Sequence, residues 1–408
     1  MIQLSNQEKL KPWKGIVLFA LGVLFLLFLG SYLQNTFGIP GLILSELGFL
    51  ALSVIYCLIN KVSLKEVFPI KKITLRDLFG VVFMFIGGFL LNYLCLGISI
   101  FVWDKLGRRD FFSEITALSD FLFGSGLTYI ALILVVAVTP AICEEAFMRG
   151  AILSSFRGLK KDRYIIFIVG VMFGILHLSP LRFLNTAALG CVLAYIMVKK
   201  NNILLPMLLH FLNNFIPSVL GVSQMSDMDS FAERFESIDS TALLGTFLLI
   251  SFMFPFFLVL GNKLLDKEGH KGIYFLYAGI ISAVLLISGT AILFVSSGNM
   301  LKNNAILNWN YSFEVTEDSL SAKDLAEAGI TIDEEKDISI VVTATAKDSD
   351  ITFTITDSEG EVVYTNTGHG TLIVSENGMH LAPGEYTLFF TGDESMIGKK
   401  IRYQVVVM

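Results

Sequence analysis

Charged residues are scarce in this chain of 408 residues. Asp, Glu, Lys and Arg make up 16% of it, while hydrophobic residues make up 54% and the mean hydropathy is +0.69. Soluble globular domains carry about 25% charged residues, so this composition excludes an ordinary soluble protein and predicts a membrane protein. We expect the chain to lie in a lipid bilayer and to have no nucleic-acid partner.

Cysteine is also rare. The four cysteines, Cys57, Cys95, Cys143 and Cys191, all lie in apolar stretches, and none follows residue 300. Their spacing matches no thiolate metal site, which indicates small buried apolar residues. A cleavable signal peptide is not expected, because the apolar run after Lys14 is too long for one and lacks a small-residue cleavage site.

Long apolar runs fill the first 300 residues. Nine runs approach the length of about 20 residues that crosses a bilayer. The fifth and sixth are short and the seventh is polar in its middle, so we expect one of these three to be tilted or re-entrant. The sequence therefore predicts an α-helical polytopic bundle with eight or nine spans. The runs are residues 14–33, 40–59, 78–103, 127–148, 163–179, 183–198, 203–220, 241–261 and 272–296.

The sign of the charge changes near residue 300. Residues 303–408 hold 18 acidic and 6 basic residues, a net charge of −12, whereas the remainder has a net charge of +6. Short alternating segments there predict strands, with turn signals between them. We therefore expect a bundle over residues 1–300 and a small, acidic, β-sandwich-like domain over 301–408. The predicted strands are 338–346, 351–356, 386–391 and 401–407, and the predicted turns are 357–360, 376–378 and 383–384.

Lysine and arginine cluster in alternate loops. They precede the first apolar run and follow the second, fourth, sixth and eighth. Cytoplasmic loops carry this excess, so nine spans predict a cytoplasmic N-terminus and an extracellular C-terminal domain. A cysteine-free extracellular domain suits a bacterial cell membrane of the Gram-positive type. An envelope component is then a candidate partner for the acidic domain.

Two adjacent carboxylates, Glu144 and Glu145, lie in the fourth apolar run. Glu145 and Arg149 are four residues apart, so one helix face carries both and predicts an ion pair. Glu144 is rotated about 100° away and can serve a different, chemical role. A charge cluster at a cytoplasmic helix end would give the same pattern.

Two of the five histidines also lie in apolar runs. His177 follows Phe173 by four residues, and His210 precedes Asn214 by four. A carboxylate and His177 together can orient and deprotonate water. An imidazole and an amide on one helix face can bind an oxyanion, although polar pairs also serve helix packing. The combination predicts a hydrolase without a Ser or Cys nucleophile.

A zinc site is an alternative use of the same residues. Glu144, His177 and His210 form a Glu/His/His set, which with an open position is a catalytic zinc site. The His-Glu-x-x-His helix is absent, so no motif favours zinc. Glutamate-activated water and metal-bound water both stay open.

Three motifs in this order resemble the signature of a known family, the CAAX-protease and bacteriocin-processing (Abi) family of intramembrane endopeptidases. This family includes the Ras-converting prenyl-protein endopeptidase. The resemblance covers about residues 125–220 and implies a helical bundle whose site opens toward the cytoplasmic leaflet. The motifs are Glu144-Glu145-x-x-x-Arg149, Phe173-x-x-x-His177 and His210-x-x-x-Asn214.

The resemblance also implies roles for these residues. Glu144 would activate water, and His177 would help to position it. His210 and Asn214 would form the oxyanion hole. Glu145, Arg149 and Phe173 would support the site, and family members are described as glutamate-dependent or as metalloproteases.

These observations predict a membrane endopeptidase that cleaves a membrane-associated peptide or protein. A non-catalytic immunity or scaffold protein is the alternative, and a small-solute transporter is a third. Counted along the apolar runs, Glu144 and His210 lie about six and seven residues from the cytoplasmic end, whereas His177 lies about 14. This mismatch in depth suggests a tilted helix or a misplaced boundary.

Overall fold

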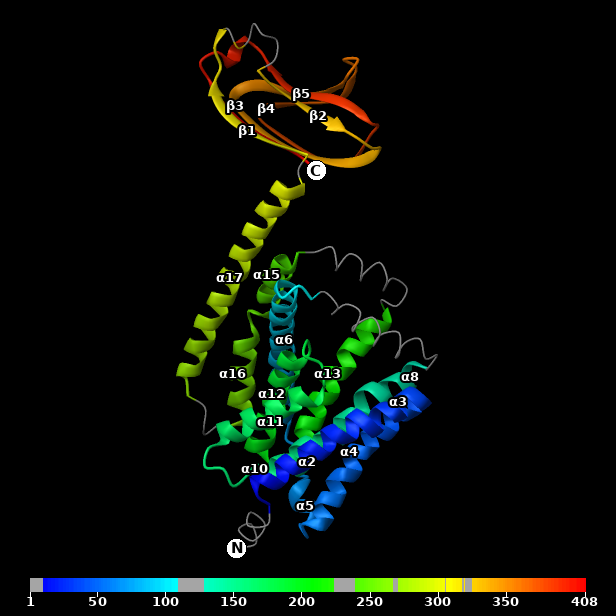
Figure 1. Ribbon diagram of the computed structural model, residues 1–408. Coiled ribbons are helices and arrows are strands. Elements are labelled where there is room, and N and C mark those ends of the chain that lie inside the picture. The colour runs from blue at the N-terminus through cyan, green and yellow to red at the C-terminus, as the bar shows by residue number, and fades with distance from the viewer. Residues whose placement is uncertain are drawn as a thin grey trace. The chain divides into compact units, whose positions relative to one another are not determined.

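The computed structural model describes residues 10–108, 128–223, 239–266, 271–304, 306–317, 319 and 325–408. The chain divides into two compact units, Met1–Leu293 and Phe294–Met408. The first is helical, and the second is built around β-strands (Figure 1). The predicted fold class, a helical membrane bundle followed by a small all-β domain, is confirmed.

Seven helical stretches among the described residues are long and apolar enough to cross a membrane. The fifth and seventh predicted runs form helices α11 and α13, which are not among these seven spans. The spans are Pro12–Phe37, Ile39–Ile59, Leu75–Lys105, Tyr129–Phe156, Phe183–Lys200, Ser240–Leu265 and Ile273–Ser296. The helices, including three π-helical segments (η1 to η3), are α2 (Pro12–Phe25), η1 (Leu26–Gly30), α3 (Ser31–Phe37), α4 (Ile39–Ile59), α5 (Leu64–Val67), α6 (Leu75–Lys105), α8 (Tyr129–Ile133), η2 (Leu134–Val138), α9 (Thr139–Glu145), η3 (Ala146–Ile152), α10 (Leu153–Phe156), α11 (Asp162–Leu176), α12 (Phe183–Lys200), α13 (Leu204–Ser223), α15 (Ser240–Ser251), α16 (Phe254–Leu265) and α17 (Ile273–Asn304).

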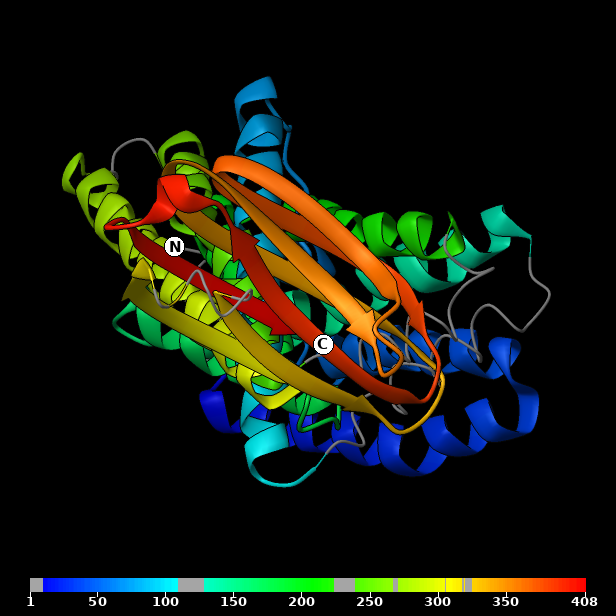
Figure 2. The same ribbon diagram turned by 90° about the horizontal axis from the view of Figure 1, so that it is seen from above.

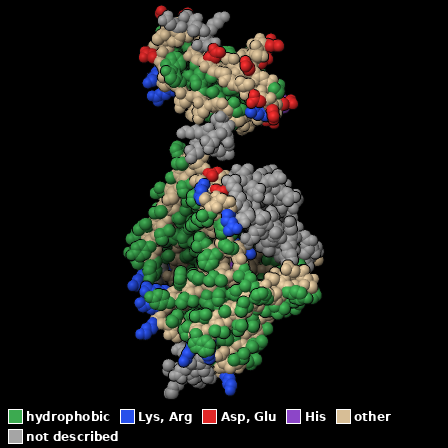
Figure 3. Space-filling view, in the orientation of Figure 1, with side chains coloured by type: hydrophobic (Ala, Val, Ile, Leu, Met, Phe, Trp, Pro, Cys, Tyr) green, Lys and Arg blue, Asp and Glu red, His purple; other side chains and the backbone are tan. Residues whose placement is uncertain are grey.

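The outer surface of the helical unit is hydrophobic. Hydrophobic side chains cover its visible face, and Lys and Arg gather near its lower end (Figure 3). Phe28, Ile59 and Ile130 are each more than 70% exposed. Soluble monomers rarely expose apolar surface on this scale, so lipid is the natural solvent for this unit.

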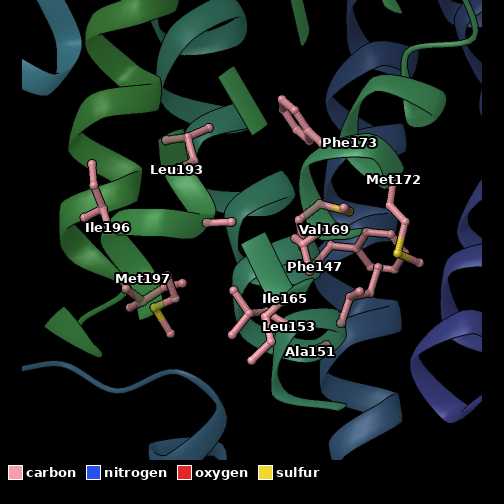
Figure 4. Close-up of a cluster of buried hydrophobic side chains, with 14 of the residues drawn as sticks. Phe147, Ala151, Leu153, Ile165, Val169, Met172, Phe173, Leu193, Ile196 and Met197 are labelled. Carbon is pink, nitrogen blue, oxygen red and sulfur yellow. The ribbon is translucent and has the colours of Figure 1, made fainter. Parts of the chain in front are cut away.

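Helices α11 and α12 meet at two glycines in the centre of this unit. A Cβ atom at Gly190 would lie 2.9 Å from the Gly170 backbone oxygen, so only glycine allows this approach. Phe147, Phe173 and Leu193 fill the surrounding core and are completely buried (Figure 4). Small residues that let helix backbones approach are the usual device for packing in membranes.

The fourth span is one continuous helix from Tyr129 to Phe156. Two π-helical segments, η2 and η3, flank the short α-helix α9. Pro140 lacks an N–H, so the Val136 carbonyl, four residues earlier, loses its α-helical donor. The helix accommodates this by widening into η2 rather than by ending.

The C-terminal unit contains one antiparallel sheet of six strands with the order β1-β6-β3-β5-β2, and β4 also pairs with β3. Figure 2 shows these twisted strands from above, coloured yellow to red. A single buried core joins residues from all six strands, which gives the sandwich-like interior. The strands are β1 (Leu307–Glu314), β2 (Ala326–Ile332), β3 (Lys336–Asp357), β4 (Val362–Leu381), β5 (Gly384–Gly392) and β6 (Lys400–Val407).

Two predicted strands, 338–346 and 351–356, form one long strand, β3. A register shift between Ala346 and Asp350, with a positive φ of 51° at Asp348, bends it in the middle. Its first half pairs with β6 and its second half with β5. One prediction is wrong: 376–378 is not a turn but a bulge inside β4, where Gly378 has φ 75°. A bulge and a turn share the same sequence signal, because both need a residue in the left-handed region.

Candidate active site

The first motif contains a fully buried ion pair. Arg149 Nη1 donates to Glu145 Oε1 at 2.9 Å, and both side chains are 0% exposed. The four-residue spacing holds across the junction between α9 and η3, so both residues lie on one face. Because neither charge reaches solvent, each depends on the other for compensation.

Arg149 also ties this helix to its neighbours. Nη2 donates to the Gly190 carbonyl oxygen on α12 at 3.1 Å. The guanidinium lies over the ring of Phe173 on α11, 4.3 Å from its centroid. Planar guanidinium suits this combination of donation to two acceptors and stacking, which lysine does not reproduce.

His210, on α13, joins the two carboxylates. Its Nδ1 lies 2.9 Å from Glu145 Oε1, and its Nε2 lies 3.9 Å from Glu144 Oε2. An ionised carboxylate only accepts, so Nδ1–H donates to Glu145 and Nε2 is the nitrogen directed toward Glu144. Glu145 therefore fixes the orientation of the imidazole ring, as the second carboxylate does in many histidine-containing sites.

His177 caps the C-terminal end of α11. Its Nδ1–H donates to the Phe173 carbonyl oxygen at 2.9 Å, and Nε2 has no hydrogen bond among the described residues. Phe173 lies between the two imidazoles, with centroid distances of 4.8 Å to His177 and 5.8 Å to His210. The second and third motifs are thus joined through one aromatic ring.

Helix lengths account for the predicted mismatch in depth. The helix that carries Glu144 continues to Phe156 instead of ending at residue 148, so Glu144 lies about 18 Å from that end. His177 lies about 22 Å from the start of α11 at Asp162. The predicted boundary was wrong because the apolar pattern breaks at Arg149, whose charge is buried inside the bundle.

Asn214 lies about one turn after His210 on α13. Its Nδ2 donates to the Val136 carbonyl oxygen at 3.1 Å, and its Oδ1 accepts from Asn213 Nδ2 at 3.2 Å. In the described residues its amide bonds to these partners rather than to His210. One N–H of Nδ2 remains without a partner there.

Sequence reasoning missed Glu46 on α4. Its side chain is buried, and its Oε2 has no hydrogen-bond partner among the described residues. The ring centroids of Phe49 and Phe147 lie 5.0 Å apart, one turn beyond Glu46 and Glu144 respectively, so the two carboxylates lie on packed helices. The sequence does mark this residue, because Glu46 is the one acidic or basic residue in the second apolar run, and a charged side chain inside a membrane span is costly.

Metal-ligating side chains do not gather here. Among the described residues, no group of three or more His, Cys, Asp and Glu side chains has an arrangement that could hold a metal ion. One nitrogen of each imidazole donates to Glu145 or to the Phe173 carbonyl, an arrangement that ligating histidines also adopt. The predicted set Glu144, His177 and His210 forms no metal-binding cluster among the described residues.

The comparisons with known proteins concern this same region. Residues 126–216 match the family model described as Rce1-like, type II CAAX prenyl endopeptidase Rce1-like. The match covers 91 of the 408 residues and supports, at the level of the family, an intramembrane CAAX-type protease, a hydrolase. The CAAX-protease segment contains all three motifs, and no curated protein matches the chain.

Proposed function

We propose that the chain is an intramembrane endopeptidase that hydrolyses a peptide bond of a membrane-associated peptide or protein by glutamate-activated water. The observation that carries this proposal is that the two adjacent carboxylates differ in their hydrogen-bond partners. Glu145 is bonded to both Arg149 and His210, whereas Glu144 Oε2 is buried without a hydrogen-bond partner among the described residues. An uncommitted carboxylate next to a directed imidazole is suited to accept a proton from water.

The water-activating side of the site consists of Glu144 and His177. Glu144 takes the proton of the attacking water and returns it to the leaving amine. His177 has its Nδ1–H bound to the Phe173 carbonyl oxygen, so its Nε2 lone pair can accept a hydrogen bond from the same water. Proton transfer by a positioned group contributes roughly 10²–10⁴-fold in rate.

The oxyanion-binding side consists of His210 and Asn214. With Nδ1–H donated to Glu145, a protonated His210 has Nε2–H as its second donor. Asn214 contributes the N–H of Nδ2 that Val136 does not use. Removal of one such donor costs roughly 10²–10³-fold in kcat.

Cleavage of a membrane-peptide library tests the proposal. Purified wild type is compared with Glu144→Ala, His210→Ala and the matched control Cys143→Ala, a buried neighbour with no assigned role. We expect cleavage to disappear in the first two and to persist in the control. Equal cleavage by all four proteins would refute the roles of Glu144 and His210, and no cleavage by the wild type would favour a non-catalytic membrane protein.

Addition of a chelator separates the two hydrolytic mechanisms. Glutamate-activated water predicts that cleavage by the wild type is unchanged by the chelator. Loss of cleavage that zinc restores would contradict the metal-free mechanism, although the assignment as a protease would stand.

We further propose that the N-terminus is cytoplasmic and that the acidic β unit lies outside the cell, where it binds an envelope partner. The seven candidate spans among the described residues support this proposal, because an odd number of crossings puts the two ends on opposite sides of a membrane. Added protease should remove the β unit from intact bacterial cells. A protected β unit would mean that the topology is wrong.

A further inference from the structure

Three asparagine side chains form a continuous row beside the site. Asn92 Nδ2, on α6, donates to Asn213 Oδ1 at 3.0 Å, and Asn213 Nδ2 donates to Asn214 Oδ1 at 3.2 Å. Asn214 Nδ2 then donates to the Val136 carbonyl oxygen at 3.1 Å. Each amide therefore donates in the same direction, from α6 through α13 to the helix that carries the carboxylates.

The last acceptor sets this direction. A backbone carbonyl can only accept, so Asn214 must turn its NH2 group toward Val136 and its oxygen toward Asn213. Asn213 must then present its own NH2 group to that oxygen, and so turns its oxygen toward Asn92. A reversal of any one amide would bring two oxygens or two NH2 groups together.

Two prolines leave backbone carbonyls in this region without their α-helical donors. Pro140 cannot donate to the Val136 carbonyl, which is therefore open to the side chain of Asn214. Pro217 lies inside α13 and cannot donate to the Asn213 carbonyl, four residues earlier. The Asn213 carbonyl therefore lacks its α-helical donor, and Ser218 Oγ donates to the Asn214 carbonyl at 2.7 Å.

Asn92 is energetically unfavourable at its position. It lies within the third apolar span, and its Oδ1 is buried without a hydrogen-bond partner among the described residues. An unsatisfied polar atom in a membrane span is unfavourable, and a leucine would fill the same space without that cost. This suggests that Asn92 serves the orientation of Asn213 rather than the stability of the bundle.

We propose that Asn92 and Asn213 are positioning residues, which hold the Asn214 amide so that its second Nδ2–H points at the developing oxyanion. This proposal rests on the role of Asn214 given under Proposed function. Without Asn92 and Asn213, the bond to the Val136 carbonyl alone would orient the Asn214 amide, and its oxygen would face the oxyanion in a larger share of molecules. The donor would then be lost at the step that creates negative charge.

Asn92→Leu and Asn213→Leu test the proposal, since leucine resembles asparagine in shape but cannot donate. We expect each variant to lower kcat by roughly 10-fold or more, a part of the 10²–10³-fold effect of a lost oxyanion donor, with KM unchanged. Asn262→Leu on α16 is the matched control. Asn262 accepts a hydrogen bond from Tyr195 but lies outside the row, so kcat should stay at the wild-type value.

Coupling to Asn214 distinguishes positioning from helix packing. In an Asn214→Ala background, Asn92→Leu should cause no further loss of kcat, because it acts through the missing amide. An equal loss in both backgrounds, or a rise in KM alone, would overturn the proposal. If Asn214→Ala itself left kcat unchanged, the oxyanion role of Asn214 would fail instead. Should Asn92→Leu not fold, Asn213→Leu gives the same comparison from α13.

Discussion

Arg149→Met is the sharpest test of the buried charge network. Methionine keeps an unbranched apolar side chain but leaves the Glu145 carboxylate without its cation, at a position that is 0% exposed. Removal of one partner of a buried pair typically costs about 3–5 kcal/mol. The Gly190 carbonyl also loses a donor and Phe173 loses its cation. These losses belong to the same group, so we expect about 3–5 kcal/mol in total.

The double variant Glu145→Gln/Arg149→Met removes both charges of the ion pair. It leaves no uncompensated carboxylate, and the amide oxygen of the introduced glutamine can still accept from His210. Replacement of a whole buried pair by neutral groups is often nearly neutral for stability. The free energy of unfolding of the double variant should therefore lie at least ~1 kcal/mol closer to the wild-type value than that of Arg149→Met alone.

Denaturant titration of the purified protein in lipid bicelles, followed by far-UV circular dichroism, measures these free energies. Arg157→Met is a matched control. Arg157, at the C-terminal end of α10, donates to Asn201 at 2.6 Å, and loss of a hydrogen bond to a charged group costs about 1.5–3 kcal/mol, less than loss of the buried pair. The reasoning is refuted if Arg149→Met unfolds like Arg157→Met, or if the double variant is less stable than Arg149→Met.

Three further predictions concern other parts of the chain. Hydrogen bonds to Asp337 and Glu335 raise the pKa of the exposed His380 above its usual value of 6.5, so its charged form stabilises the β unit below that pH. This contribution should vanish as the pH rises through the raised pKa, and His380→Gln should flatten the pH dependence of thermal unfolding. Gly190→Ala should lower the yield of folded protein on size-exclusion chromatography, because its Cβ would lie 2.9 Å from a backbone oxygen of α11. Pro140→Ala supplies the missing N–H to the carbonyl that holds the asparagine row, and should lower kcat in the peptide-cleavage assay without a change in KM.

Composition and spacing were sufficient for the coarse fold. The apolar runs, the change of charge near residue 300 and the alternating segments of the tail predicted a helical bundle followed by strands. The spacing of Glu145 and Arg149 also predicted their ion pair, because contacts four residues apart depend only on the helix period. Local periodicity carries this information, since it does not depend on how distant segments pack.

Contacts between distant segments could not be predicted in this way. The bond from His210 to Glu145, the stacking of Arg149 on Phe173 and the donation to the Gly190 carbonyl all join separate helices. The sequence assigned His210 to the oxyanion hole without showing that Glu145 orients it. Backbone acceptors such as the Val136 carbonyl carry no side-chain signal, although Pro140 marks where one becomes free.

The π-helical segments that flank the carboxylates make this helix sensitive to its length. An i→i+5 turn holds one residue more than the α-helical turn it replaces, so deletion of one residue from η2 would restore a regular helix. The parts of the helix before and after η2 would keep about the same relative orientation, because the π-helical turn already accommodates the extra residue. The Val136 carbonyl would lose the widened turn from which Asn214 takes it as an acceptor, with no catalytic side chain altered. The residue count of this segment is therefore expected to matter as well as the residue type.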